Sequence, residues 1–334
     1  MTIDERTTHM AIKEKSTFGR IIENTVSRVG ELGLLAAAIV VLGAFFTVVS
    51  PVFLSVGNFV NIIRATSIVI VLALGMTYVI VSAEIDVSIG GIMAFSGVLA
   101  GLTINEFGAI AGVLVALAVG LTFGILNGLI TVRFGIPSFI VTIGMLGVTR
   151  GGAFIASAQS TVIVRNENIT SVFGGSLAGL PNLVIWALGL SVVAAVILWK
   201  TKFGRHVYAT GDSEQAARYS GINTNKVKVL TLALAGLCAG IAGLLFIGRL
   251  GVARPGMGGG IELAVIAAVI IGGTSLFGGR GTVLGTILGA LLISVIDNGL
   301  VLLGYGSSWQ QLIRGIVIIV AVVIRAKDQE GGWL

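Results

Sequence analysis

Long apolar stretches separated by short polar segments repeat along the chain from residue 32 onward. A helix needs roughly 20 apolar residues to cross the hydrocarbon core of a membrane, and about ten stretches approach that length. They cover residues 32–54, 65–83, 89–102, 109–132, 139–158, 183–199, 229–247, 263–276, 283–303 and 312–324. Several are short or interrupted by glycine. The pattern therefore predicts an all-α polytopic membrane protein with about ten transmembrane helices.

The composition agrees with this interpretation and excludes a soluble enzyme. Only 11% of the 334 residues are charged and 55% are hydrophobic, whereas soluble domains carry about 25% charged residues. The 49 glycines fit closely packed membrane helices, where small residues let backbones approach. The single cysteine, Cys238, precludes an internal disulfide and a cysteine-based metal cage.

The 21 lysines and arginines predict the orientation of the chain. If the N-terminus is cytoplasmic, most of them fall in cytoplasmic segments, as the positive-inside rule requires. Both termini are then cytoplasmic, with an N-terminal tail at 1–31, a transmembrane domain at 32–324 that contains a cytoplasmic loop at 200–228, and a C-terminal tail at 325–334. The N-terminal tail lacks the apolar core of a cleaved signal peptide. The net charge of +6 is then a sign of topology, and no nucleic-acid partner is expected.

The cytoplasmic loop contains "GDSEQAARYSGINTNKVKV", residues 211–229, the longest polar stretch after the N-terminal tail. Residues 213–220 favour a short helix, with Asp212 or Ser213 as its N-cap and Gly221 as its stop. A flexible linker without a helix would need neither an N-cap residue nor a glycine that ends a helix. A short helix along a membrane surface can dock into a groove on a soluble protein.

A few polar side chains occur at predicted membrane depth, where such groups are costly and usually face a cavity or a partner. They could form hydrogen bonds with a hydroxyl-rich solute along a translocation pathway, and the candidates are Asn61, Asp86, Ser88, Glu262, Asp297 and Asn298. Glu84 and Asp86 could instead be solvated or salt-bridged at the cytoplasmic interface. Arg150 and Arg314 could be interfacial anchors or internal salt-bridge partners.

Two glycine series predict close helix packing. Small residues spaced four apart share one helix face and let two helices cross closely. The series are Gly120, Gly124 and Gly128, and Gly281, Gly285 and Gly289. The segments 79–97 and 269–289 also resemble each other, because each places a polar, glycine-rich break between apolar runs, which is typical of a translocation pathway. The alternative is a chance similarity between two apolar segments of low complexity.

Sequence signatures of catalysis are missing. The chain has no phosphate-binding loop of the form G-x-x-x-x-G-K-[ST]. Its two histidines, His9 and His206, lie in predicted cytoplasmic segments, so no metal site is expected. We therefore expect a protein that is not an enzyme, and any energy for pumping must come from an ion gradient or a partner.

Three stretches together resemble one family: "FGRHVYATGDSEQAARYSGINTNKVKV", "GMTYVIVSAEIDVSIGG" and "GIELAVIAAVIIGGTSLFGGRGTVLGTILGALL". They look like the permease subunit of ATP-binding-cassette importers for monosaccharides of the ribose, xylose and galactose type. Branched-chain amino-acid permeases share part of the pattern. The resemblance implies a prokaryotic inner-membrane permease that pairs with a second permease subunit as a homo- or heterodimer. It also implies a cytoplasmic ATPase that holds ATP and Mg²⁺, and an extracytoplasmic sugar-binding protein.

The resemblance also implies a role for the polar segment as the contact with the ATPase. The residues that match this family motif are Gly211, Glu214, Ala216, Ala217, Ser220, Gly221 and Ile222. The chain departs from the family elsewhere: "AEIDVSIG" stands where relatives usually read G-G-I-D-L-S-V-G, so Glu84 replaces a glycine. Ala264 replaces a frequent aspartate, and Asp297 a frequent asparagine, so the resemblance leaves open which sugar or polyol is carried.

Two alternatives remain from the sequence. A gradient-driven secondary transporter would need no ATPase, and an intramembrane carboxylate such as Asp297 would then titrate or bind an ion. A branched-chain amino-acid permease would share the predicted architecture, although no clear ammonium or carboxylate pair for an amino acid is evident in the pathway.

Overall fold

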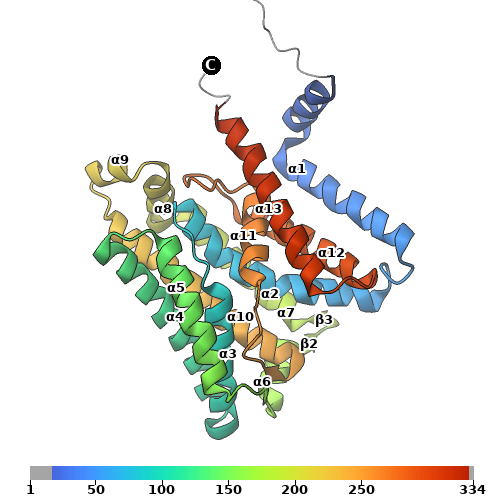
Figure 1. The fold of residues 1–334 in the computed structure, drawn as a ribbon, viewed down its shortest axis with the longest axis vertical. Coiled ribbons are helices and arrows are strands. Elements are labelled where there is room, and N and C mark those ends of the chain that lie inside the picture. The colour runs from blue at the N-terminus through green and yellow to red at the C-terminus, as the bar shows by residue number, and fades with distance from the viewer. Residues whose placement is uncertain (1–16, 331–334) are drawn as a thin grey trace, which may run out of the picture.

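The computed structural model describes residues 17–330, which form helices and four two-residue strands (Figure 1). The helices are α1 (Thr17–Val49), α2 (Val56–Val81), α3 (Ile89–Phe107), α4 (Ala109–Phe134), α5 (Ser138–Ala156), α6 (Glu167–Gly174), α7 (Asn182–Lys200), α8 (Lys202–Asp212), α9 (Glu214–Tyr219), α10 (Thr224–Leu250), α11 (Ile261–Ile271), α12 (Val283–Leu302) and α13 (Ser307–Glu330). The strands are β1 (Val162–Ile163), β2 (Ser176–Leu177), β3 (Leu180–Pro181) and β4 (Val252–Ala253). The prediction of an all-α membrane protein is confirmed.

Within the described part of the chain, eight helices are long and apolar enough to cross a membrane. The other two predicted spans coincide with α11, which has only 11 residues, and α13. A count of ten crossings and the cytoplasmic position of the termini therefore stay predictions.

Several predicted span boundaries were wrong. Helix α2 begins at Val56, where the Ser55 side chain accepts a hydrogen bond from the amide of Asn58, so Arg64 lies inside the helix rather than before it. Helix α3 continues to Phe107. Helix α1 begins at Thr17, inside the predicted tail at 1–31, and bends at Gly30, and α13 extends to Glu330 inside the predicted C-terminal tail, so the bounds of both tails stay predictions. The rest of both tails, residues 1–16 and 331–334, lies outside the described residues.

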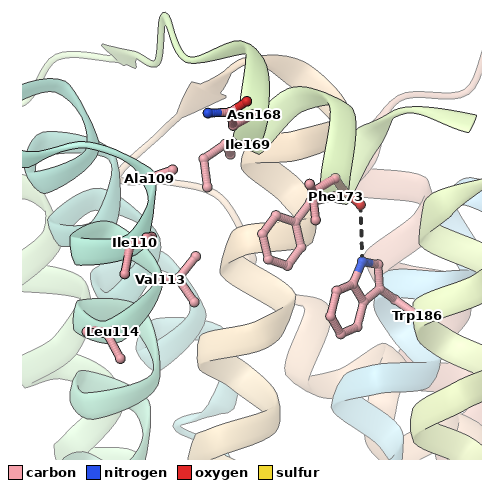
Figure 2. A pocket seen from close by; sticks show the side chains of 9 residues that line it. Ala109, Ile110, Val113, Leu114, Asn168, Ile169, Phe173 and Trp186 are labelled. Carbon is pink, nitrogen blue, oxygen red and sulfur yellow. Dashed lines mark hydrogen bonds between the residues drawn. The ribbon is translucent and has the colours of Figure 1, made fainter.

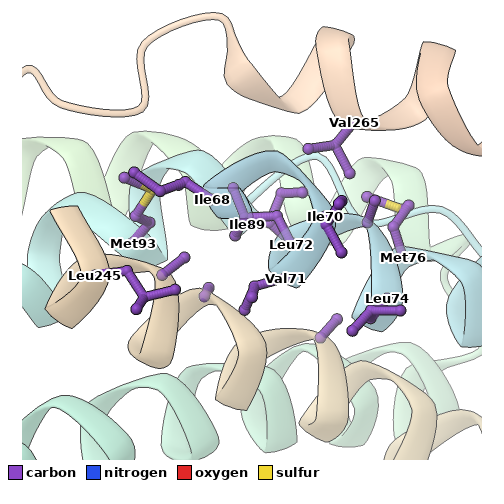
Figure 3. Close-up of a cluster of buried hydrophobic side chains, with 14 of the residues drawn as sticks. Ile68, Ile70, Val71, Leu72, Leu74, Met76, Ile89, Met93, Leu245 and Val265 are labelled. Atoms are coloured by element: carbon purple, nitrogen blue, oxygen red, sulfur yellow. The ribbon is translucent and has the colours of Figure 1, made fainter. Parts of the chain in front are cut away.

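Helices α2 and α10 form the centre of the protein. Figure 3 shows the side chains of Val71, Leu72 and Leu74 from α2 beside Leu245 from α10 and Met93 from α3. Val71 and Leu72 are fully buried. Nearly every residue of α2 in the range 66–81 is buried, so this part of the helix has no lipid-facing stripe. The polar groups in this core therefore have to find partners within the protein.

The first glycine series lies at the crossing of α4 and α10. A Cβ atom on Gly120, Gly124 or Gly128 would collide with the backbone of α10 at Gly236, Leu232 or Val229. In the second series, Gly285 and Gly289 lie against the end of α11 at Gly272 and Ala268.

The prediction that Gly281 shares a helix face with Gly285 and Gly289 was wrong. Helix α12 begins only at Val283, because the side chain of the N-cap residue Thr282 accepts a hydrogen bond from the Gly285 amide and starts the helix there. Gly281 instead lies against Thr274 and Val81.

The connections between helices gather at two ends of the bundle. At one end, which we call the α9 end, α8 and α9 lie beside the connections 82–88 and 272–282. The 272–282 connection is also held to the end of α2, because the Gly279 amide donates a hydrogen bond to the Val81 carbonyl over 3.0 Å. The Ile85 amide donates to Ser138 Oγ at the start of α5, over 3.0 Å. At the opposite end, β1 pairs with β4 and β2 pairs with β3 near α6.

The outer faces of the bundle are apolar. Large exposed hydrophobic side chains are found on α1, α4, α5 and α7, for example Val40, Ile110, Ile155 and Val192. Such large apolar surfaces are rare on soluble monomers. Here they are the surface that a lipid bilayer covers.

Candidate functional site

The polar segment forms two short helices, α8 and α9, at the α9 end. Thr201 caps the start of α8, and Ser213 ends α8 and caps α9, its Oγ accepting a hydrogen bond from the Ala216 amide over 3.3 Å. Gly221 follows α9 with φ of 80°, a conformation that favours glycine. The predicted short helix with Ser213 as its cap and Gly221 as its stop is confirmed. The predicted loop at 200–228 is therefore mostly helical, since α7 ends at Lys200 and α10 begins at Thr224.

The segment has a buried side and an exposed side. Gly211 is buried, and a Cβ atom there would collide with the Val81 carbonyl and the Gly279 amide. Ala217 is also buried, at 4% exposure. Ala216, Ser220 and Gly221 are exposed, whereas Glu214 and Ile222 are half-buried. One face therefore packs α8 and α9 against the bundle, and the other is exposed.

Glu214 is the centre of a network of charged groups. Its Oε1 accepts a hydrogen bond from Arg218 Nη2 at 2.6 Å, and its Oε2 contacts Lys228 Nζ at 2.8 Å. Thr224 Oγ1 also donates to Glu214 Oε1 over 3.2 Å. Partial burial would raise the pKa of this carboxyl, but the hydrogen bonds and charges of Lys228 and Arg218 outweigh it, so the pKa of Glu214 lies below its ordinary value.

Lys228 extends the network to the connection between α2 and α3. Its Nζ lies 2.8 Å from Glu84 Oε1, and both side chains are largely buried. The interpretation of Glu84 as a salt-bridged group is therefore confirmed, although its carboxylate is shielded from solvent. The partner comes from α10, 144 residues along the chain from Glu84.

Asp86 and Ser88 form a separate buried cluster with Asn127 of α4. Asp86 Oδ1 accepts hydrogen bonds from the amide of Ser88 at 2.8 Å and from its hydroxyl at 2.6 Å. Asn127 Nδ2 then donates to Ser88 Oγ over 2.8 Å. All three side chains are fully buried. The cluster fixes the turn that leads into α3.

Glu262, at the start of α11, pairs with Arg150 of α5. The Arg150 Nη2 atom lies 2.9 Å from Glu262 Oε1. Glu262 Oε2 is buried without a hydrogen-bond partner, and the Arg150 side chain is 37% exposed. The pair therefore retains an unused acceptor and unused donors.

Asp297 and Asn298 of α12 have different neighbours. Asp297 accepts two hydrogen bonds from Arg314 of α13, at 3.1 and 2.6 Å. Asn298 exchanges two hydrogen bonds with Asn58 of α2, at 2.9 and 2.8 Å. The alternative in which Arg150 and Arg314 are internal salt-bridge partners is therefore confirmed for both arginines.

Hydrogen bonds divide the pathway candidates into the Asp86–Ser88 cluster, the Glu262 pair and the Asp297–Asn298 contacts. The three sets are neighbours, because Gly90 lies against Glu262 Oε2 and Arg314 also donates to the Gly260 carbonyl over 3.4 Å. Asn61 lies on the exposed surface of α2. A cavity of about 410 Å³ lies elsewhere, between α4, α6 and α7 (Figure 2). Its lining is apolar apart from the Asn168 side chain and the edge of Trp186, whose Nε1 donates to the Val172 carbonyl. It is unsuited to the hydroxyl groups of a sugar.

Sequence reasoning missed Lys228 and Gly236, and it named Asn127 only as a polar group at membrane depth. Lys228 was counted only as a basic topology signal, although a lysine at the start of an apolar helix often has a carboxylate partner. Asn127 stood out as a polar residue within an apolar run, but its partner could not be read from the chain. Gly236 and Gly240 form a G-x-x-x-G pattern in α10 that was a readable signal for helix crossing.

Comparison with known proteins identifies the family. The chain is 39% identical over 298 residues to the ribose import permease protein RbsC of Escherichia coli strain K12, which covers 87% of this chain and 92% of that protein. It is 38% identical over 299 residues to the RbsC of Bacillus subtilis, covering 89% of this chain and 91% of that protein. It is also 34% identical over 292 residues to the autoinducer 2 import system permease protein LsrC of Yersinia pseudotuberculosis, covering 87% and 83%.

A family model described as branched-chain amino acid transport system / permease component matches residues 58–322. The matched range includes the whole α9 end, from the 82–88 connection to the first turns of α12. Together with the apolar outer faces and the candidate spans, this establishes a multi-pass membrane protein of the inner membrane. The chain thus belongs to the permease-component family of transport systems that contains the ribose import permeases.

Proposed function

We propose that this chain is the membrane-spanning subunit of an ATP-binding-cassette importer that carries a monosaccharide or a related polyol into the cell. The observation that carries the proposal is the end-to-end similarity to ribose import permeases, which covers about nine-tenths of the chain and of its relatives. The similarity to an autoinducer 2 permease widens the substrate class to small polyhydroxylated molecules.

ATP hydrolysis takes place in a partner under this proposal, and this chain holds no ATP or Mg²⁺ of its own. The exposed face of α8 and α9 is the contact with the cytoplasmic ATPase. What supports this is the two-sided form of the segment, in which buried Gly211 and Ala217 attach it to the bundle and Ala216, Ser220 and Gly221 remain accessible. A second permease subunit and an extracytoplasmic sugar-binding protein complete the importer.

The Arg150–Glu262 pair is the best-supported contact for the transported sugar. A sugar hydroxyl can accept from a guanidinium and donate to a carboxylate. The Arg150 side chain is 37% exposed and has further donors, and Glu262 Oε2, which is buried in this structure, has no other hydrogen-bond partner. The Asp297–Arg314 pair is better suited to holding α12 against α13, because the two side chains satisfy each other.

Transport by the assembled importer tests the proposal. The complex, purified through a tag on this chain together with its co-expressed ATPase, is reconstituted in proteoliposomes with the binding protein. We expect uptake of radiolabelled ribose, xylose or galactose that requires ATP on the ATPase side and is unaffected by proton and sodium ionophores. Uptake abolished by ionophores would identify a gradient-driven transporter, and uptake of leucine alone would identify an amino-acid permease.

Arg150→Met tests the sugar contact in the same vesicles. We expect sugar uptake to fall at least tenfold while ATP hydrolysis by the complex persists. Arg133→Met, which removes an arginine from the last turn of α4, is the matched control. Equal uptake by the two variants would remove Arg150 from the pathway.

A further inference from the structure

One lysine side chain joins two carboxylates from separate parts of the protein at the α9 end. Lys228 Nζ lies 2.8 Å from Glu84 Oε1 and 2.8 Å from Glu214 Oε2. Glu84 belongs to the 82–88 connection between α2 and α3, and Glu214 is the first residue of α9. An ammonium group has three donors, so it can serve both carboxylates at the same time.

The side chains become more buried along this series of contacts, from α9 inward. The exposed fraction of the side chain is 56% for Arg218, 37% for Glu214, 17% for Lys228 and 8% for Glu84. Exposed ion pairs contribute little to stability, whereas a buried pair is costly to break because it leaves an unpaired charge. The Glu84–Lys228 contact is thus the firm inner link, and the contacts of Glu214 are the ones that can exchange with solvent or with a partner.

The inner link ends in a segment that carries the buried polar cluster. Glu84 is two residues before Asp86, whose carboxylate holds Ser88 and, through it, Asn127 of α4. The 82–88 connection is also held to α5, where the Val87 amide donates to Thr142 Oγ1 over 3.1 Å. A displacement of Glu84 therefore reaches α3, α4 and α5 through hydrogen bonds.

We propose that Lys228 is a positioning residue that transmits movement of α9 to the 82–88 connection, with Glu84 as its inner partner. The proposal rests on the proposed contact between α9 and an ATPase. The same lysine is bound to both moving parts, so a shift of Glu214 pulls on Glu84 through one ammonium group.

A mutant cycle on the purified chain tests the shared lysine without any partner. In Glu84→Gln or Glu214→Gln alone, Lys228 keeps one carboxylate, so each single variant should lower the unfolding temperature only slightly. The double variant leaves Lys228 without a carboxylate, so its loss should clearly exceed the sum of the two single losses. Additive losses would overturn the proposal, because they would show that the two carboxylates do not depend on the same group.

Hydrogen exchange in the assembled complex tests the transmission itself. In the wild type, addition of ATP with vanadate should change exchange both in α9 and in residues 82–88. In Lys228→Met, α9 should still respond while residues 82–88 do so at least threefold less, and sugar imported per ATP hydrolysed should fall. Lys228→Arg should restore both, and Lys226→Met, which removes an exposed lysine one half-turn away, should behave as the wild type.

The outcomes separate the two proposals. A full response of residues 82–88 in Lys228→Met, or an equal defect in Lys226→Met, would overturn the role of Lys228 while the function of α9 stands. An absence of any response of α9 in the wild-type complex would instead overturn the ATPase contact, and the role of Lys228 with it.

Discussion

The crossing of α4 and α10 allows a direct test of how the bundle is held together. In Gly124→Ala the new Cβ atom would lie 2.5 Å from the Leu232 carbonyl oxygen and 2.9 Å from the Cα atom of Ala233. Both are backbone atoms of α10, so they cannot turn aside as a side chain could. The two helices have to separate, and a gap of about 0.5–1 Å forfeits a quarter to a half of the dispersion attraction across it.

The magnitude follows from two opposing effects. Overpacking a well-filled core costs about 1–3 kcal/mol, and alanine in a helix interior returns about 1 kcal/mol relative to glycine, so we expect a net loss of about 1 kcal/mol. Gly189→Ala in α7 is the matched control, because nothing lies within 4 Å of its added Cβ atom. The control should gain up to about 1 kcal/mol, so the two variants should differ by about 2 kcal/mol.

Reversible unfolding of the purified protein in mixed micelles, titrated with sodium dodecyl sulfate and followed by tryptophan fluorescence, measures this difference. The comparison between the two alanine variants removes the helix-propensity contribution and leaves only the steric one. A Gly124→Ala protein as stable as the Gly189→Ala protein would refute the close crossing.

Three further predictions concern the polar contacts. Asp297→Ala leaves Arg314 buried without its carboxylate and should cost about 3 kcal/mol in the same titration; a loss under about 0.5 kcal/mol would contradict the pairing. Asn58→Leu removes both hydrogen bonds to Asn298 and should cost about 1 kcal/mol, since interhelical hydrogen bonds in membranes average about 0.6 kcal/mol each; unchanged stability would argue against these bonds. The pKa of Glu214 is lowered in the folded protein. Its ion pairs therefore stabilise α9 fully at pH values above the ordinary carboxyl pKa, and this stabilisation is lost as the pH falls through the lowered pKa of Glu214. Hydrogen exchange in α9 should therefore be constant, after correction for the intrinsic rate, from about pH 7 to about pH 5, and a loss of protection in that range would oppose this assignment.

The fold class and the local structure of α9 could be predicted from the sequence. Membrane helices are encoded by long apolar runs, and the start and stop of α9 are encoded by Ser213 and Gly221, which act within a few residues of their own position. Exact helix boundaries were harder to predict, because the apolar residues that face lipid and those that face the core are the same types. Helix α2 therefore extends past Arg64, which looked like a boundary from its charge alone.

The candidate site was less predictable because its contacts join distant parts of the chain. Glu262 and Asp297 were recognised as unusual polar groups, but their partners Arg150 and Arg314 became certain only in three dimensions. Glu84 is 144 residues from Lys228, and nothing in the local sequence of either residue specifies the other. The same limit explains Gly281, whose spacing matched a helix that begins two residues later at Val283.

Helix α9 has only six residues, and isolated helices shorter than about 12–15 residues are marginal in water. Its shape is therefore maintained by the Ser213 cap, the Gly221 stop and the groups beneath it, rather than by the helix propensity of its six residues alone. At the proposed contact with an ATPase, a linear peptide that copies residues 211–222 would compete poorly with α9, because the peptide would lose conformational entropy on binding. An inhibitor of the proposed contact has to reproduce the fixed backbone of α9, for example by cyclisation, and not merely its amino-acid sequence.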